Sequence, residues 1–175
     1  MSNSALIAAP AASDEDATLF VGFELAKSAW LIGLYSPELG TKVSRHKVDG
    51  GDLDKVLDLI AAAKQRLLRS GKAARVRVVS IYEAGYDGFW PHRALLSAGV
   101  ENRVIDAASV PVDRRARRIK TDRLDLEQLV RVLLALERGE TRACRVVRVP
   151  TPDEEDAKRQ HREREVLGGP HTLIG

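Results

Sequence analysis

The sequence has few of the residues that cross-link a chain or bind soft metals. Its 175 residues include one cysteine, Cys144, which excludes a disulfide framework and a cysteine-rich zinc site. Aromatic residues make up only 5% of the chain, and no apolar run reaches the roughly 18 residues of a membrane span. The apolar stretch near the N-terminus has no basic flank and precedes an acidic run, unlike a secretory signal. We therefore expect a cytoplasmic protein with a disordered tail over residues 1–17.

The composition is typical of one globular domain. Hydrophobic residues make up 44% of the chain and charged residues 30%, while the formal net charge is only +3. Because the net charge is small, the position of the basic residues matters more than their number. Six of them fall within ten positions: Arg114, Arg115, Arg117, Arg118, Lys120 and Arg123. Arginine binds phosphate oxygens in a bidentate manner, so this basic run predicts nucleic-acid binding. A solvated loop or a protein-binding patch is the alternative.

Hydrophobic periodicity predicts three strands followed by alternating helices and strands. The expected strands are 19–25, 29–35, 41–48, 75–82 and 100–106, and the expected helices are 53–68, 87–98 and 122–137. The order β-β-β-α-β-α-β-α predicts a mixed α/β sheet with flanking helices. The ribonuclease-H-like fold has this order, although the pattern alone leaves other α/β arrangements open. We assign residues 18–140 to this domain, and residues 141–175 to a linker and the start of a charged helix.

Four acidic residues stand where such a fold would place a site. Glu24 ends the first strand, Glu83 ends the fourth, and Asp122 and Asp125 begin the last helix, where positions i and i+3 share a face. Ligands of α/β sheets bind at the carboxyl ends of strands, and carboxylate oxygens suit magnesium. The pattern therefore predicts a divalent-metal site, with solvated loop residues and a helix cap as the alternatives.

Aromatic residues follow the fourth strand. Tyr82, Tyr86, Phe89 and Trp90 could stack on bases, or they could pack in the core.

Three motifs resemble the N-terminal domain of the insertion-sequence-110 family of transposases, the DEDD type related to the Piv invertase. The motifs are Phe20-Val-Gly-Phe-Glu-Leu-Ala-Lys27, Tyr82-Glu83-Ala-Gly-Tyr-Asp-Gly-Phe-Trp90 and Arg117-Arg-Ile-Lys-Thr-Asp-Arg-Leu-Asp125. The resemblance implies a RuvC-like fold and Mg²⁺ or Mn²⁺ bound by Glu24, Glu83, Asp122 and Asp125. It also implies DNA strand cleavage and transfer directed by a structured guide RNA. A homo-oligomer is a further expectation. Lys27 and the arginines of the third motif would then lie near nucleic acid.

The sequence departs from the family pattern at two points. Glu24 stands where the family has aspartate, and no second domain with a serine nucleophile follows the charged helix. These departures predict a truncated transposase that is incomplete as an enzyme. A stand-alone RuvC-type nuclease that cuts branched DNA and a non-catalytic nucleic-acid-binding remnant are the alternatives.

Overall fold

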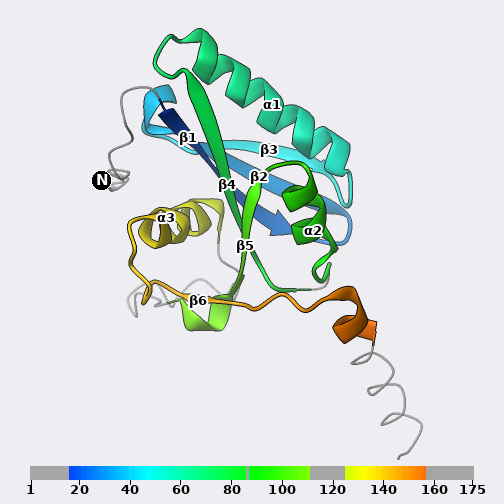
Figure 1. The fold of residues 1–175 in the computed structure, drawn as a ribbon. Coiled ribbons are helices and arrows are strands. Elements are labelled where there is room, and N and C mark those ends of the chain that lie inside the picture. Colours follow the sequence, from blue (N-terminus) through cyan, green and yellow to red (C-terminus); the bar gives the residue numbers. More distant parts are fainter. Residues whose placement is uncertain (1–15, 86, 111–124, 157–175) are drawn as a thin grey trace, which may run out of the picture.

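The computed structural model describes residues 16–85, 87–110 and 125–156, and these form one mixed sheet with helices on both faces (Figure 1). The strands are β1 (Asp16–Leu25), β2 (Ala29–Tyr35), β3 (Ser44–Asp49), β4 (Arg75–Glu83), β5 (Glu101–Asp106) and β6 (Arg145–Val146). The helices are α1 (Leu53–Arg69), α2 (Trp90–Ser97) and α3 (Leu126–Glu137), with 3₁₀ turns η1 (Pro37–Leu39) and η2 (Ala107–Ser109). The predicted α/β class and element order are confirmed.

The sheet order is β3-β2-β1-β4-β5-β6. Strands β1, β2 and β3 form an antiparallel meander, while β4 and β5 run parallel to β1. Parallel neighbours need crossover connections, and α1 and α2 supply them. The carboxyl ends of β1, β4 and β5 therefore meet at one edge of the sheet.

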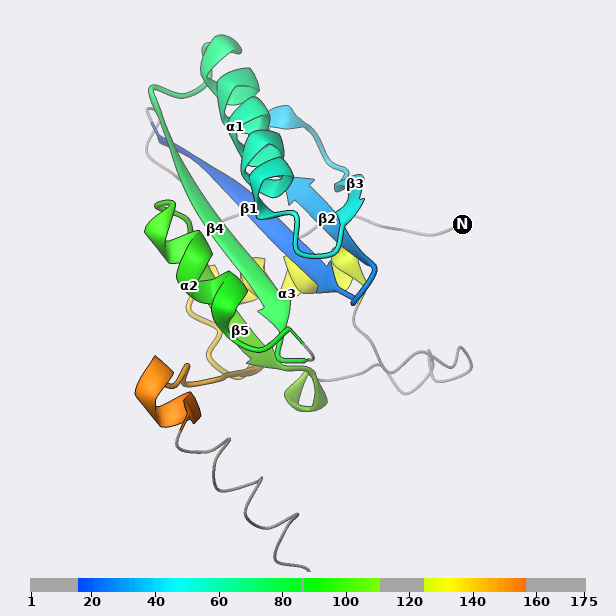
Figure 2. The same cartoon turned by 90° about the vertical axis from the view of Figure 1, so that its right-hand side faces the viewer.

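The two faces of the sheet are covered by different helices. Figure 2 shows α1 and α2 in front of the strands and α3 behind them. Side chains alternate between the faces along β1: Val21 and Phe23 belong to the core under α1 and α2, whereas Phe20 belongs to the core under α3. This alternation assigns every strand residue to a face.

Two glycines allow α3 to approach its face closely. Gly22 and Gly33 are paired across β1 and β2. A Cβ atom at Gly33 would lie 3.1 Å from the Cβ of Leu126, and one at Gly22 would lie 3.3 Å from the Cβ of Leu129. The start of α3 therefore rests directly on the backbone of β1 and β2.

Local capping chemistry defines both ends of α1. The Asp52 side chain accepts a hydrogen bond from the Lys55 backbone N–H at 3.1 Å, and Gly71 follows the helix with a φ of 70°. Helix α2 differs from its prediction, because residues 87–89 form a turn and the helix begins only at Trp90, with Pro91 in its first turn.

The segment that follows α3 is attached to the sheet and to α2. Val146 in β6 pairs with Ile105 in β5. A helical turn then begins at residue 152, where Thr151 and Glu154 form a reciprocal capping box, and Glu155 pairs with Arg93 of α2 at 2.5 Å. No helix within the described residues has both the length and the apolar character that crossing a membrane requires.

Candidate functional site

Glu24 and Glu83 lie beside each other at the carboxyl edge of the sheet. The parallel register of β1 and β4 pairs Phe23 with Tyr82, so the next residues along the two strands are Glu24 and Glu83. Phe23 and Tyr82 point into the core under α1 and α2. By alternation, both glutamates belong to the opposite face, which carries α3. Each glutamate is half-buried.

The third described acidic residue, Asp125, stands at the start of α3. Its side chain accepts a hydrogen bond from the Gln128 backbone N–H at 2.8 Å, and its backbone is extended, with a ψ of 165°. Asp125 is therefore the N-cap of α3, and its prediction as part of the helix is wrong. Aspartate favours this position because its carboxylate satisfies an otherwise unpaired N–H. Asp122 lies outside the described residues.

The start of α3 lies on the same side of the sheet as the two glutamates. Leu126 contacts the Gly22–Gly33 row, and Glu24 stands two residues beyond Gly22 on the same face of β1. That step is about 7 Å along a strand. The fold thus brings Glu24, Glu83 and the N-cap of α3 to one edge of one face.

The chemistry of these side chains suits a hard cation, since all are carboxylates. Within residues 16–85, 87–110 and 125–156, however, no three acidic, histidine or cysteine side chains are grouped closely enough to hold a metal ion. A magnesium site therefore stays a prediction that also involves Asp122.

The residues predicted to bind nucleic acid are only partly described. Lys27 is exposed in the turn between β1 and β2, three residues beyond Glu24. The basic run, comprising Arg114, Arg115, Arg117, Arg118, Lys120 and Arg123, lies outside the described residues.

The described aromatic residues of the second motif are packing residues. Tyr82 is buried, and its hydroxyl donates to the Gly88 carbonyl at 3.0 Å. Trp90 stacks on the buried Trp30, with ring centroids 5.5 Å apart, and Phe89 packs against the same core. They lie on the face opposite the carboxylates. The core alternative is confirmed for Tyr82 and Phe89, whereas Trp90 keeps 40% exposure. Tyr86 lies outside the described residues.

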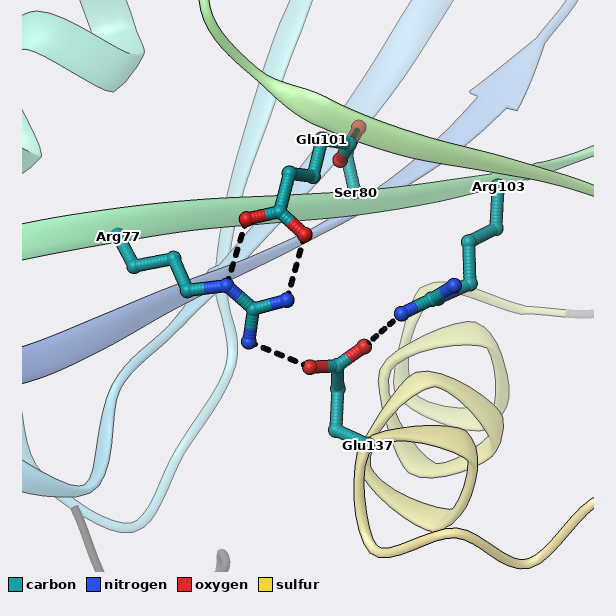
Figure 3. A network of polar contacts seen from close by, with 5 residues as sticks. All are labelled: Arg77, Ser80, Glu101, Arg103 and Glu137. Atoms are coloured by element: carbon teal, nitrogen blue, oxygen red, sulfur yellow. Dashed lines mark hydrogen bonds and ion pairs between the residues drawn. The ribbon is translucent and has the colours of Figure 1, made fainter.

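An ion-pair network fixes the far end of α3 to the sheet (Figure 3). Arg77 on β4 contacts Glu101 on β5 through two hydrogen bonds of 2.6 and 2.5 Å, and contacts Glu137 at the end of α3 at 2.6 Å. Glu137 also accepts from Arg103 on β5. Only 7% of the Glu137 side chain is exposed, so both of its oxygens are satisfied by arginine in a largely dry position.

The network changes the proton affinities of its members. Hydrogen bonding to Arg77 lowers the pKa of Glu101, and hydrogen bonding to Glu101 and Glu137 raises the pKa of Arg77 despite partial burial. Behind the network, Ser80 donates to Asn102 at 2.7 Å, and Asn102 contacts His92 of α2 at 2.9 Å. Burial, together with the nearby Arg93 charge, lowers the pKa of His92.

The sequence gives no local signal for this network. Arg77 is separated from Glu101 by 24 positions and from Glu137 by 60. Only the pairing of β4 with β5 and the packing of α3 bring the charges together. The network was therefore missed by motif and spacing arguments.

Comparison with known proteins gives one relevant similarity. The chain is 47% identical over 149 residues to a protein of Sinorhizobium fredii (strain NBRC 101917 / NGR234) named "Putative transposase y4rJ". The similarity covers 85% of this chain but only 37% of that protein's length. No family model and no solved structure matches the chain.

Proposed function

We propose that this chain carries the RuvC-like, ribonuclease-H-like domain of a DEDD-type transposase of the insertion-sequence-110 family. In this proposal it binds DNA, together with a structured guide RNA, and contributes an acidic metal site to strand cleavage and transfer. The observation that carries the proposal is the register that sets Glu24 beside Glu83 on the face where α3 begins. The similarity to a protein named as a transposase and the β-β-β-α-β-α-β-α element order support it.

The proposed metal ligands are Glu24, Glu83, Asp122 and Asp125. Bound Mg²⁺ or Mn²⁺ would activate the attacking oxygen and stabilise the leaving oxygen of a phosphodiester. The protein's own contribution is positional. Strands β1 and β4 hold two carboxylates on a rigid sheet, and the glycine contacts under α3 fix the helix start relative to them. Glu24 has no side-chain hydrogen bond or ion pair among the described residues, which leaves both of its oxygens for a cation.

Lys27 and the basic run would hold the negatively charged backbone of the nucleic acid. Lys27 lies three residues beyond Glu24, at the same edge of the sheet. Arginine contacts to phosphate make binding strong, independent of sequence and sensitive to salt.

Titration calorimetry with Mg²⁺ tests the metal site. We expect the unchanged chain to bind Mg²⁺ and Glu83→Gln to lose that binding. Asp58→Asn serves as a control, because Asp58 is exposed on α1 at the other face of the sheet. Identical isotherms for the unchanged chain and Glu83→Gln would reject the metal site.

Binding of a labelled DNA oligonucleotide tests the interface. The double substitution of Arg117 and Arg118 by alanine should weaken binding and flatten its salt dependence, because two phosphate contacts are lost. Unchanged affinity of the double variant across a salt titration would reject the basic run as the interface. Cleavage of a branched junction by this chain alone, with Mg²⁺, would favour a stand-alone nuclease.

A further inference from the structure

The carboxyl edge of the sheet carries an ordered row of side chains that extends beyond the two glutamates. Glu24 on β1 pairs with Leu31 on β2, and Leu31 pairs with Lys47 on β3. Paired residues share a face of a sheet, so Lys47, Leu31 and Glu24 lie side by side on the α3 face, and Glu83 continues the row on β4. With about 4.8 Å between strands, Lys47 stands about 10 Å from Glu24 and about 15 Å from Glu83.

Helix α3 does not cover this row. Its first residue, Leu126, rests on Gly22 of β1 and Gly33 of β2. Gly22 lies two residues before Glu24 on β1. Gly33 lies two residues after Leu31 on β2, so the helix begins one step away from the row. Leu31 accordingly keeps 36% exposure, although it is a large apolar residue in an inner strand, and Lys47 is exposed. The row therefore has an exposed leucine between a cation and a carboxylate pair.

The cationic end of the row is available for a ligand. Lys47 has no ion-pair partner among the described residues. Arg45, two positions earlier on the same face and about 7 Å away, pairs with Glu127 at 3.0 Å, but both side chains are more than 40% exposed. Such an exposed pair is weak and exchanges readily with a phosphate. Strand β3 is the outer strand of the sheet, so both cations stand at the rim.

We propose that the row Lys47–Leu31–Glu24–Glu83 is the track of one single-stranded segment of nucleic acid, with Lys47 and Arg45 holding its phosphates and Leu31 supporting a sugar or base. This inference rests on the proposed function and adds the direction of the strand across the sheet, from the rim at β3 to the carboxylates. An apolar side chain between a cation and the carboxylates suits a single strand, because the sugars and bases of a single strand are open to contact.

Chemical rescue at Lys47 tests the track. Lys47→Cys removes the charge, and aminoethylation of the introduced thiol restores a side chain of nearly the same length and charge. The native Cys144 is only 6% exposed and is thus protected from the reagent. Lys64→Cys is the matched control, because Lys64 lies on α1 at the opposite face. Fluorescence anisotropy with a labelled single-stranded DNA oligonucleotide across a salt titration is the measurement.

We expect Lys47→Cys to weaken binding roughly fivefold to tenfold and to reduce the slope of log K against log salt by about 0.7. Aminoethylation should restore both values, while Lys64→Cys should change neither. Leu31→Ser should weaken binding at every salt concentration without changing the slope, because its contact is apolar. Thermal melting checks that each variant is folded.

Two results would overturn the track. The first is a Lys47→Cys variant that binds single-stranded DNA as tightly as the unchanged chain, while the Arg117 and Arg118 double variant binds it more weakly. The proposed function would then stand, but the track would be rejected. The second is a Lys47→Cys variant that binds duplex DNA more weakly but binds the single-stranded oligonucleotide as well as the unchanged chain does. An unchanged chain that binds no oligonucleotide at low salt would instead reject the proposed function itself.

Discussion

Arg77 of β4 and Glu137 at the last turn of α3 form an ion pair of 2.6 Å that joins the helix to the sheet at the end opposite Asp125. Because Asp125 and Glu137 stand at the two ends of one helix, this contact helps to set where the N-cap of α3 lies. The Arg77–Glu137 pair therefore helps to position the candidate site, although the pair and the site lie at opposite ends of α3.

Replacing Glu137 should destabilise the fold. Glu137→Ala leaves Arg77 with only Glu101 and leaves Arg103 without its carboxylate partner, so we expect a loss of about 1–3 kcal/mol in the free energy of unfolding. Urea denaturation measures it. Glu140→Ala, which removes an exposed pair with Arg138, is the control and should cost less than about 1 kcal/mol. Equal stability of the two variants would contradict a structural role for the network.

The network should also make stability depend on pH in the acidic range. The pKa of Glu101 is lower in the folded protein than its ordinary value of 4.5, so the unfolded chain binds the proton more readily. The stability from this pair is present above pH 4.5 and is lost as the pH falls through the lowered pKa. Glu101→Gln should therefore show a shallower loss of melting temperature below pH 4.5 than the unchanged chain. Parallel curves would contradict this assignment.

Close packing of α3 on β2 should make Gly33 intolerant of a methyl group. The added Cβ would lie 2.9 Å from Val43 and 3.1 Å from Leu126, so Gly33→Ala should cost about 1–3 kcal/mol in the free energy of unfolding. Gly85→Ala is the control, because its Cβ would meet nothing closer than 3.7 Å and its φ is not positive. Denaturation curves that coincide for the two variants would show that the packing around Gly33 is looser than these distances indicate.

The glutamate at position 24 provides a test of site geometry. On the proposed function, Glu24→Asp restores the residue that the resembled family carries and withdraws the carboxylate by one methylene. Displacements of this size can change a rate by on the order of a hundredfold. We expect faster Mg²⁺-dependent strand cleavage in the complete recombination system, with a melting temperature within a few degrees of the unchanged chain. A slower variant would mean that the site is built for the longer side chain.

The sequence predicted the elements well wherever local chemistry decides them. Strand 29–35 has its predicted bounds, and the α1 cap at Asp52 follows from a short polar side chain before a helical pattern. Prediction was poorer at Thr41, because β3 begins only at Ser44, and at Asp87, because a turn precedes α2. Asp125 shows the same limit: an aspartate near a helix start can be a cap or a first-turn residue, and only backbone geometry separates the two.

The type and order of the elements, and the acidic residues at the strand ends, follow from local periodicity and composition. Which residues become neighbours depends on the packing of distant segments. The register set Glu24 beside Glu83 and aligned them with Leu31 and Lys47, and packing joined Arg77 to Glu137 across 60 positions. Strand register depends on pairing between distant segments, and a shift of one residue would move every one of these side chains to the other face.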